Sequence, residues 1–194
     1  MASLRDQAGV AALVLEFTIL TAARTGEVIG ATWSEIDLAE AIWTVPGARM
    51  KAGREHRVPL SEAAVAVLRR AAKQQPMDTP APDAPVFPGG KAGKPLSNMA
   101  MLALLARMKR GDLTSHGFRS SFRDWVSEAT GYPREVAEAA LAHKLKDKVE
   151  AAYRRGDLLE KRRRLMDEWA ARCAQLAEKP GANEVVAIRA GAAA

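Results

Sequence analysis

One stretch near the start of the chain constrains the fold more than any other. From Gln7 to Ala23, apolar residues occupy nearly every face of a helix. A surface helix needs only one apolar stripe, so a helix that is apolar all round has to be enclosed by other elements. We therefore predict that this helix lies at the centre of the core. With 194 residues, of which 48% are hydrophobic, the chain suffices for about one domain.

A small antiparallel sheet is predicted after this helix. Strand patterns cover residues 36–38, 41–46 and 56–60. The last two alternate apolar and polar residues, and the turn between them contains Gly47 and Gly53. Most of the remaining chain has helical patterns, including residues 115–130 and 158–176. The expected fold is α+β and mainly helical, with one small three-stranded antiparallel sheet.

The composition favours an acidic partner. There are 29 Lys and Arg against 23 Asp and Glu, a net charge of +6, which suits DNA, RNA or an anionic membrane surface. The single cysteine, Cys173, excludes an intramolecular disulfide and a cysteine-based zinc site. The most apolar stretch, Val10 to Ala23, is too short to span a bilayer and contains Glu16. We expect a cytoplasmic protein without a membrane partner.

Cationic side chains occur in a pattern that suits a phosphate group. Cleaving a phosphodiester without a metal requires cationic donors around a doubly charged transition state. His116 and Arg119 are three residues apart at the start of a predicted helix, which places both on one face near the positive helix end. Such a pair is also common on a solvated helix face.

Two further segments carry candidate residues. Arg24 follows the apolar helix, and Glu27, three residues later, is placed to orient its guanidinium. An arginine is also common at the end of a buried helix, where its side chain extends to the solvent. Tyr153 follows His143 by ten residues and lies among basic residues, where a phosphate can approach. The other tyrosine, Tyr132, lies at a Gly-Tyr-Pro helix boundary typical of a packing residue.

Together these segments resemble the tyrosine recombinases, in particular integrases of prophages and genomic islands. The resemblance runs from about Thr21 to Cys173 and includes the stretches 49–60 and 141–155. It implies a DNA breaking–rejoining fold and site-specific recombination, in which a mobile element is integrated or excised through a 3′-phosphotyrosyl intermediate. It implies no metal and no other cofactor.

The resemblance assigns three residues to the phosphate and its leaving group. Arg24 and Arg119 would clamp the scissile phosphate, which suits the planar donor fork of arginine. Lys51, in the turn between two strands, would protonate the leaving 5′ oxygen. Many relatives carry glycine near the first arginine and before the second histidine, where this chain has Ala22 or Ala23 and Ala142.

The remaining roles fall on two histidines and a tyrosine. His116 and His143 would hydrogen-bond the phosphate and assist proton transfer, and Tyr153 would be the nucleophile. Free tyrosine has a pKa of about 10, so roughly a thousandth is ionised at pH 7. Neighbouring cations must therefore assist its deprotonation.

The resemblance also implies a domain organisation. Residues 1–177 would form the catalytic domain and residues 178–194 a tail, while the N-terminal core-binding and arm-binding domains of relatives are absent from the sequence. The expected partner is double-stranded DNA, with a homotetramer on recombination sites for a full-length enzyme. This chain alone is expected to be monomeric, to bind DNA weakly and not to complete recombination. In bacteria it would associate with the nucleoid when on DNA.

Two other functions remain open at this stage. One is a non-catalytic DNA-binding remnant of an integrase. The other is a helical transcription regulator, for which Tyr153 and Lys51 would be dispensable. We interpret the basic run 161–164 as a solvated helix face and His56 as a strand-surface residue. The four tryptophans are interpreted as core anchors.

Overall fold

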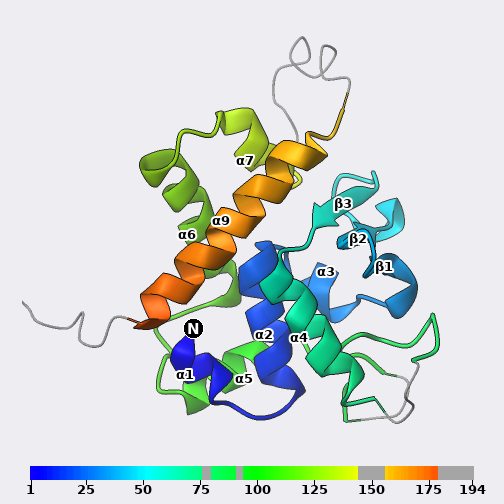
Figure 1. Ribbon diagram of the computed structural model, residues 1–194. Coiled ribbons are helices and arrows are strands. Elements are labelled where there is room, and N and C mark those ends of the chain that lie inside the picture. The colour runs from blue at the N-terminus through cyan, green and yellow to red at the C-terminus, as the bar shows by residue number, and fades with distance from the viewer. Residues whose placement is uncertain (76–79, 91–93, 144–155, 179–194) are drawn as a thin grey trace, which may run out of the picture.

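A computed structural model describes residues 1–75, 80–90, 94–143 and 156–178 (Figure 1). Its helices are, in chain order, α1 (Ala2–Arg5), α2 (Val10–Thr21), α3 (Thr25–Ile29), α4 (Glu62–Ala72), α5 (Ala100–Arg107), α6 (Ser115–Ala129), α7 (Arg134–Ala140) and α9 (Leu159–Glu178). Between α3 and α4 lie strands β1 (Ile36–Asp37), β2 (Ile42–Val45) and β3 (His56–Pro59), with 3-10 turns η1 (Trp33–Glu35) and η2 (Gly47–Arg49).

Helix α2 is the central helix, as its apolar sequence predicts. Every residue from Ala12 to Thr21 is buried. Helices α4, α5, α6 and α9 pack around it (Figure 1). Its one charged residue, Glu16, is 3% exposed and forms ion pairs with Arg5 at 2.7 Å and Arg70 at 2.9 Å. These two pairs neutralise the buried carboxylate and tie α1 and α4 to α2.

The helix is shorter than its apolar pattern, which extends from Gln7 to Ala23. It begins after Gly9, whose φ of 91° is outside the helical region, and it ends at Thr21. The residue after it, Ala22, adopts a left-handed conformation with φ 49° and turns the chain sharply. The apolar pattern continues past this point because the turn itself is buried, so hydrophobicity does not mark the end of the helix.

The predicted three-stranded antiparallel sheet is confirmed. Its order is β1-β2-β3, and Trp43 in the middle strand pairs with Ile36 on one side and Val58 on the other. Trp43 is fully buried, and its ring centroid lies 5.5 Å from that of Phe17 in α2. The sheet is therefore attached to the central helix through an aromatic contact.

Helix α9 runs diagonally across the molecule, beside α6 and α7 (Figure 1). The indole of Trp169 donates a 2.8 Å hydrogen bond to the carbonyl of Ile19 and meets Phe122 edge-on at 5.3 Å. Trp169 and Trp43 are buried as predicted, whereas Trp33 and Trp125 are partly buried against the core. No helix among the described residues is long and apolar enough to cross a membrane.

The interpretation of residues 161–164 as a solvated face is wrong at one position. Lys161 and Arg164 are exposed, but Arg162 is 1% exposed. The helical period places Arg162 on the same face as Leu165, Met166 and Trp169, which pack against the core. A run of like charges does not reveal that one of its members points inward.

Candidate active site

Arg24 lies at the turn between α2 and α3. Its Nη1 donates a 2.7 Å hydrogen bond to Oε1 of Glu27, and its backbone N–H donates to Oε2 of the same carboxylate at 3.0 Å. Glu27 is buried, whereas the Arg24 side chain is 28% exposed. The prediction that Glu27 orients the Arg24 guanidinium is confirmed, and the charged fork still reaches the surface.

Arg119 joins two turns that carry other candidate residues. It is 5% exposed, and its guanidinium donates to the carbonyls of Ala22 and Leu141. Ala22 lies two residues before Arg24, and Leu141 two residues before His143. Burial, followed by the charge of Arg24, lowers the pKa of Arg119 to about 10, so the side chain is still protonated at pH 7.

His116 is exposed at the start of α6. Thr114 caps this helix by accepting a 3.0 Å hydrogen bond from the N–H of Gly117. The hydroxyls of Ser115 and Thr25 lie 2.9 Å apart and hold the start of α6 against the start of α3. The spacing predicted that His116 and Arg119 share one face, but they differ in depth because Arg119 turns into the core.

His143 follows α7 and is held by a carboxylate. Its Nδ1 lies 2.7 Å from Oε2 of Glu138, which also pairs with Arg123 at 3.3 Å and Arg134 at 3.9 Å. Burial alone would raise the pKa of Glu138, but the hydrogen bond with His143 and the charges of both arginines outweigh it and lower this pKa. Sequence reasoning missed Glu138, whose only signal was an acid five residues before His143.

Lys51 lies on an exposed turn after η2, and within the described residues its ammonium has no hydrogen-bond or ion-pair partner. The turn is fixed by Arg49, whose Nη1 donates to the carbonyl of Glu27 at 3.1 Å and whose Nη2 pairs with Glu35 at 2.5 Å. Gly30 leaves room for this guanidinium, because a Cβ at position 30 would lie 2.5 Å from Nη1 of Arg49 and would displace it. The Lys51 turn is therefore tied to the same helix that carries Glu27.

His56 is not the strand-surface residue that we expected. It is half-buried at the start of β3, interacts with the backbone of Ala140, and lies within electrostatic range of Arg162, Glu27 and Arg119. Burial, followed by the charge of Arg162, lowers its pKa from 6.5 to about 4. The ring is thus neutral at pH 7. The alternation of strand residues could not reveal this, because it does not report that β3 packs against α9.

The His56 shift makes the protein sensitive to acid. Because the pKa is lower in the folded state than the unfolded 6.5, the unfolded state binds more protons as the pH falls, and stability falls with it. The loss should develop between pH 6.5 and 4 and reach up to about 3 kcal/mol. Urea unfolding at several pH values would measure it. The His56→Gln variant should lack this loss of stability. If its unfolding free energy fell with pH as steeply as that of the parental chain, His56 would not be the cause.

The contacts above link the turns that carry three of the six predicted site residues, Arg24, Arg119 and His143, and they place His116 at the end of α6 that is bound to α3. The turn of Lys51 is attached to the same cluster, although the Lys51 side chain makes no contact with it. Tyr153 lies outside the described residues. Among the residues that are described, no group of three or more His, Cys, Asp or Glu side chains is placed to hold a metal ion.

Two alanines beside the site have left-handed backbones. Ala22 has φ 49° and Ala142 has φ 47°, so glycine would fit both turns without strain. Ala22→Gly and Ala142→Gly should each stabilise the fold by up to about 1 kcal/mol in urea unfolding. Ala66→Gly, at an exposed position inside α4, is the control and should destabilise it by about 1 kcal/mol. If all three glycine variants lowered the free energy of unfolding equally, the backbones of Ala22 and Ala142 would not be strained.

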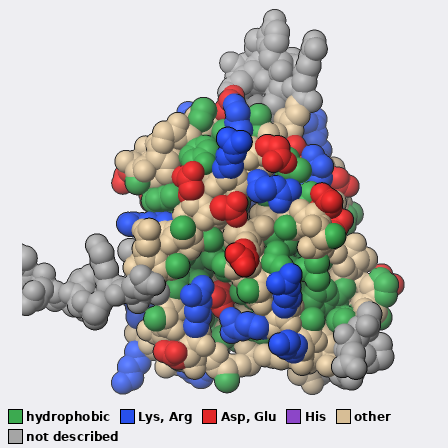
Figure 2. Space-filling view, in the orientation of Figure 1, with side chains coloured by type: hydrophobic (Ala, Val, Ile, Leu, Met, Phe, Trp, Pro, Cys, Tyr) green, Lys and Arg blue, Asp and Glu red, His purple; other side chains and the backbone are tan. Residues whose placement is uncertain are grey.

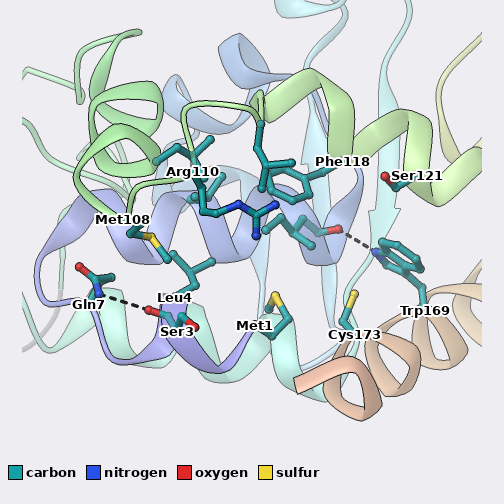
Figure 3. Close-up of a pocket in the computed structure, with 14 residues that line it drawn as sticks. Met1, Ser3, Leu4, Gln7, Met108, Arg110, Phe118, Ser121, Trp169 and Cys173 are labelled. Carbon is teal, nitrogen blue, oxygen red and sulfur yellow. Dashed lines mark hydrogen bonds between the residues drawn. The ribbon is translucent and has the colours of Figure 1, made fainter. Parts of the chain in front are cut away.

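A cavity of about 460 Å³ lies apart from this cluster (Figure 3). It is enclosed by α1, the end of α5, α6 and the C-terminal half of α9, and its lining includes Leu4, Phe118, Trp169 and Cys173. None of the candidate site residues lines it. On the face shown in Figure 2, acidic and basic side chains are interspersed and no histidine is visible.

Comparisons with known proteins agree on the family and the fold. The model of the phage integrase family matches residues 2–158. Prophage integrase IntA of Escherichia coli (strain K12) is 40% identical over 154 residues, which cover 78% of this chain and 36% of IntA. The integrase of mycobacterium phage Brujita superposes with a TM-score of 0.62 at 18% identity, covering 86% of this chain and 54% of that structure. A lambda integrase tetramer bound to a Holliday junction gives 0.53 at 18% identity, covering 75% and 44%.

Proposed function

Because the chain belongs to the phage integrase family, we propose that it cleaves and rejoins double-stranded DNA in site-specific recombination through a 3′-phosphotyrosyl intermediate. One observation of the structure carries the proposal furthest: the buried Arg119 guanidinium links the turns that present Arg24 and His143. Two cationic forks and an imidazole are thereby gathered around one place. This is the arrangement that a pentacoordinate phosphate requires.

The proposed reaction exchanges one phosphodiester for another. The Tyr153 oxygen attacks phosphorus and gives its proton to water, and the bond between phosphorus and the 5′ oxygen breaks. The 5′ oxygen takes a proton from Lys51, and the 3′ end remains joined to the tyrosine. Arg24 and Arg119 neutralise the equatorial oxygens during the transfer. A 5′ hydroxyl of another strand reverses the step, so the bond energy is conserved.

Glu138 has a positioning role in this proposal. Its carboxylate lies 2.7 Å from Nδ1 of His143, so the Nδ1 proton points at Glu138 and Nε2 is left for the phosphate. Arg123 and Arg134 keep Glu138 ionised. The carboxylate thus sets both the tautomer and the orientation of the imidazole.

Lys51→Ala should lower the cleavage rate on ordinary DNA. On DNA whose leaving 5′ oxygen is replaced by sulfur, the variant should cleave at the rate of the parental chain. A thiolate leaves without protonation, so the general acid is no longer needed. Single-turnover adduct formation on the two substrates measures the effect. Lys73→Ala, a change at the end of α4, is the control and should leave both rates unchanged. An equal defect of Lys51→Ala on oxygen and sulfur substrates would assign Lys51 to phosphate binding alone.

A nicked suicide substrate tests the proposed function. Cleavage near a nick releases a short fragment, so religation is prevented and the protein–DNA adduct accumulates. The adduct should survive denaturant and form equally well in the presence of a chelator. Salt-sensitive DNA binding without an adduct would favour the alternative function, a non-catalytic DNA-binding remnant. Absence of both would overturn the proposal.

The chain matches only part of a longer relative. The chain spans 36% of the length of IntA. We propose residues 1–177 as the catalytic domain and residues 178–194 as a tail, and we propose that the chain alone is monomeric. Assembly into a tetramer is proposed only on DNA and for a longer protein, in line with the lambda integrase structure. Sedimentation with and without DNA tests the oligomeric state.

A further inference from the structure

A buried arginine at the start of α9 binds Asp157, which lies two residues before this helix. Arg162 is 1% exposed, its Nε donates a 2.7 Å hydrogen bond to the carbonyl of Asp157, and its Nη2 lies 3.0 Å from the Asp157 carboxylate. Its Nη1 donates to the carbonyl of Arg57 in β3 at 2.6 Å. One guanidinium therefore joins the start of α9 to the sheet.

Arg57 binds the same carboxylate oxygen as Arg162. Arg57 Nε donates to Asp157 Oδ2 at 2.9 Å, and its Nη2 lies 2.8 Å from the same oxygen. Oδ1 of Asp157 accepts from the N–H of Leu159, the first residue of α9. Burial would raise the pKa of Asp157, but the charge of Arg162 and the hydrogen bond from Arg57 outweigh it, so this pKa is lowered. Asp157 is thus an ionised anchor between β3 and α9.

The backbone at this junction is strained. Leu158 has φ 56°, a left-handed conformation that a leucine rarely adopts. Its carbonyl accepts a 2.9 Å hydrogen bond from the backbone N–H of Arg162. Strained residues persist where the surrounding contacts over-determine them, and here those contacts come from Arg57 and Arg162. The direction in which the chain enters α9 is therefore fixed at Leu158.

Asp157 is four residues after Tyr153 in the sequence. A chain of four residues spans at most about 14 Å, and Tyr153 itself lies outside the described residues. Arg57 directly follows His56, which is within electrostatic range of Arg119 and Glu27. The anchor is thus beside the candidate site. Packing alone does not require this arrangement, because a methionine would fill the place of Arg162 without a buried charge.

We propose that Arg57, Asp157 and Arg162 form a clamp that positions Tyr153 for attack on the phosphate held by the same chain. The three are positioning residues and do not touch the DNA phosphate. The inference rests on the proposed function, since it assigns the tyrosine a chemical role. It predicts that loosening the clamp slows attack by Tyr153 without weakening the activation of the phosphate.

The test compares Arg162→Lys with Arg163→Lys. Lysine keeps the charge but cannot donate to Asp157 and Arg57 at once. Arg163, the matched control, donates at 3.2 Å to the carbonyl of Glu40, away from the clamp. At saturating nicked DNA, Arg162→Lys should form the adduct about 10- to 100-fold more slowly, and Arg163→Lys at the parental rate. Equal rates for both variants would overturn the proposal.

A second measurement separates positioning from general damage to the site. In Tyr153→Phe protein, peroxide replaces the missing nucleophile: the hydroperoxide anion attacks phosphorus, and the 5′ oxygen leaves with a proton. Adding Arg162→Lys should leave this peroxide-driven cleavage unchanged. An equal loss in adduct formation and peroxide cleavage would show that the clamp supports the whole site, and the positioning role would be refuted.

A third measurement needs no activity. Hydrogen exchange at the Leu159 amide should be faster in Arg162→Lys than in the parental chain and unchanged in Arg163→Lys. Unaltered exchange would overturn the clamp, whether or not the chain forms an adduct. A parental chain that forms no adduct would instead overturn the proposed function. Should Arg162→Lys fail to fold, Asp157→Asn, which keeps the side-chain shape but removes the charge, is read by the same criteria.

Discussion

Tyr153→Phe is expected to abolish the covalent DNA adduct while leaving the fold and the affinity for DNA nearly unchanged. Phenylalanine keeps the aromatic ring but removes the only atom that can attack phosphorus. Adduct on nicked DNA is measured in denaturing gels, affinity by titration and folding by thermal melting. The loss should be complete, because no other nucleophile is assigned to this step.

Tyr132→Phe is the matched control. The Tyr132 hydroxyl donates a 2.7 Å hydrogen bond to Glu168, and burial followed by this bond raises its pKa to about 12. Tyr132 is therefore a poor nucleophile at neutral pH, and its loss should leave the adduct intact. An adduct formed by Tyr153→Phe at the parental rate, or lost in Tyr132→Phe, would assign the chemistry to a different residue.

Arg119→Lys should slow adduct formation by about 10²- to 10³-fold, comparable to the loss of one donor from an oxyanion hole. An ammonium is a point charge that cannot bind the carbonyls of Ala22 and Leu141 and also present a fork to a phosphate. The turns before Arg24 and His143 lose their common partner. Single-turnover rates at saturating DNA, well below the melting temperature, measure the effect on the folded enzyme.

Arg110→Lys provides the comparison for this variant. Arg110 also binds through a fork, with two 3.0 Å hydrogen bonds to Asp112, but both side chains are exposed and separate from the site cluster. Its replacement should alter neither rate nor stability measurably. If Arg119→Lys lowered the melting temperature but not the rate, Arg119 would be a structural residue only.

The overall fold could be predicted because its signals are local. The apolar pattern around α2 indicated a central helix, and the alternation in β2 and β3 indicated the sheet. Glu27 could be predicted as the partner of Arg24 because the two are three residues apart. The end of α2 could not, since the left-handed turn at Ala22 is as apolar as the helix before it.

The supporting contacts of the site could not be predicted, because they join residues far apart in the chain. Arg162 reaches the carbonyl of Arg57 across 105 positions, and Arg119 reaches Ala22 across 97. The burial of His56 could not be predicted either, because strand alternation reports only the sheet and not the helix packed on it. In each case the residue type was visible in the sequence and its burial was not.

The most direct test of the central claim is the identity of the amino acid joined to DNA. The adduct from a nicked substrate is denatured and digested with protease and nuclease, and the modified peptide is sequenced by mass spectrometry. We expect one modified residue, Tyr153, carrying a 3′-linked nucleotide through its phenolic oxygen, in equal yield with and without a chelator. A nucleotide on any other residue, or cleavage that leaves no linkage and stops in chelator, would contradict it.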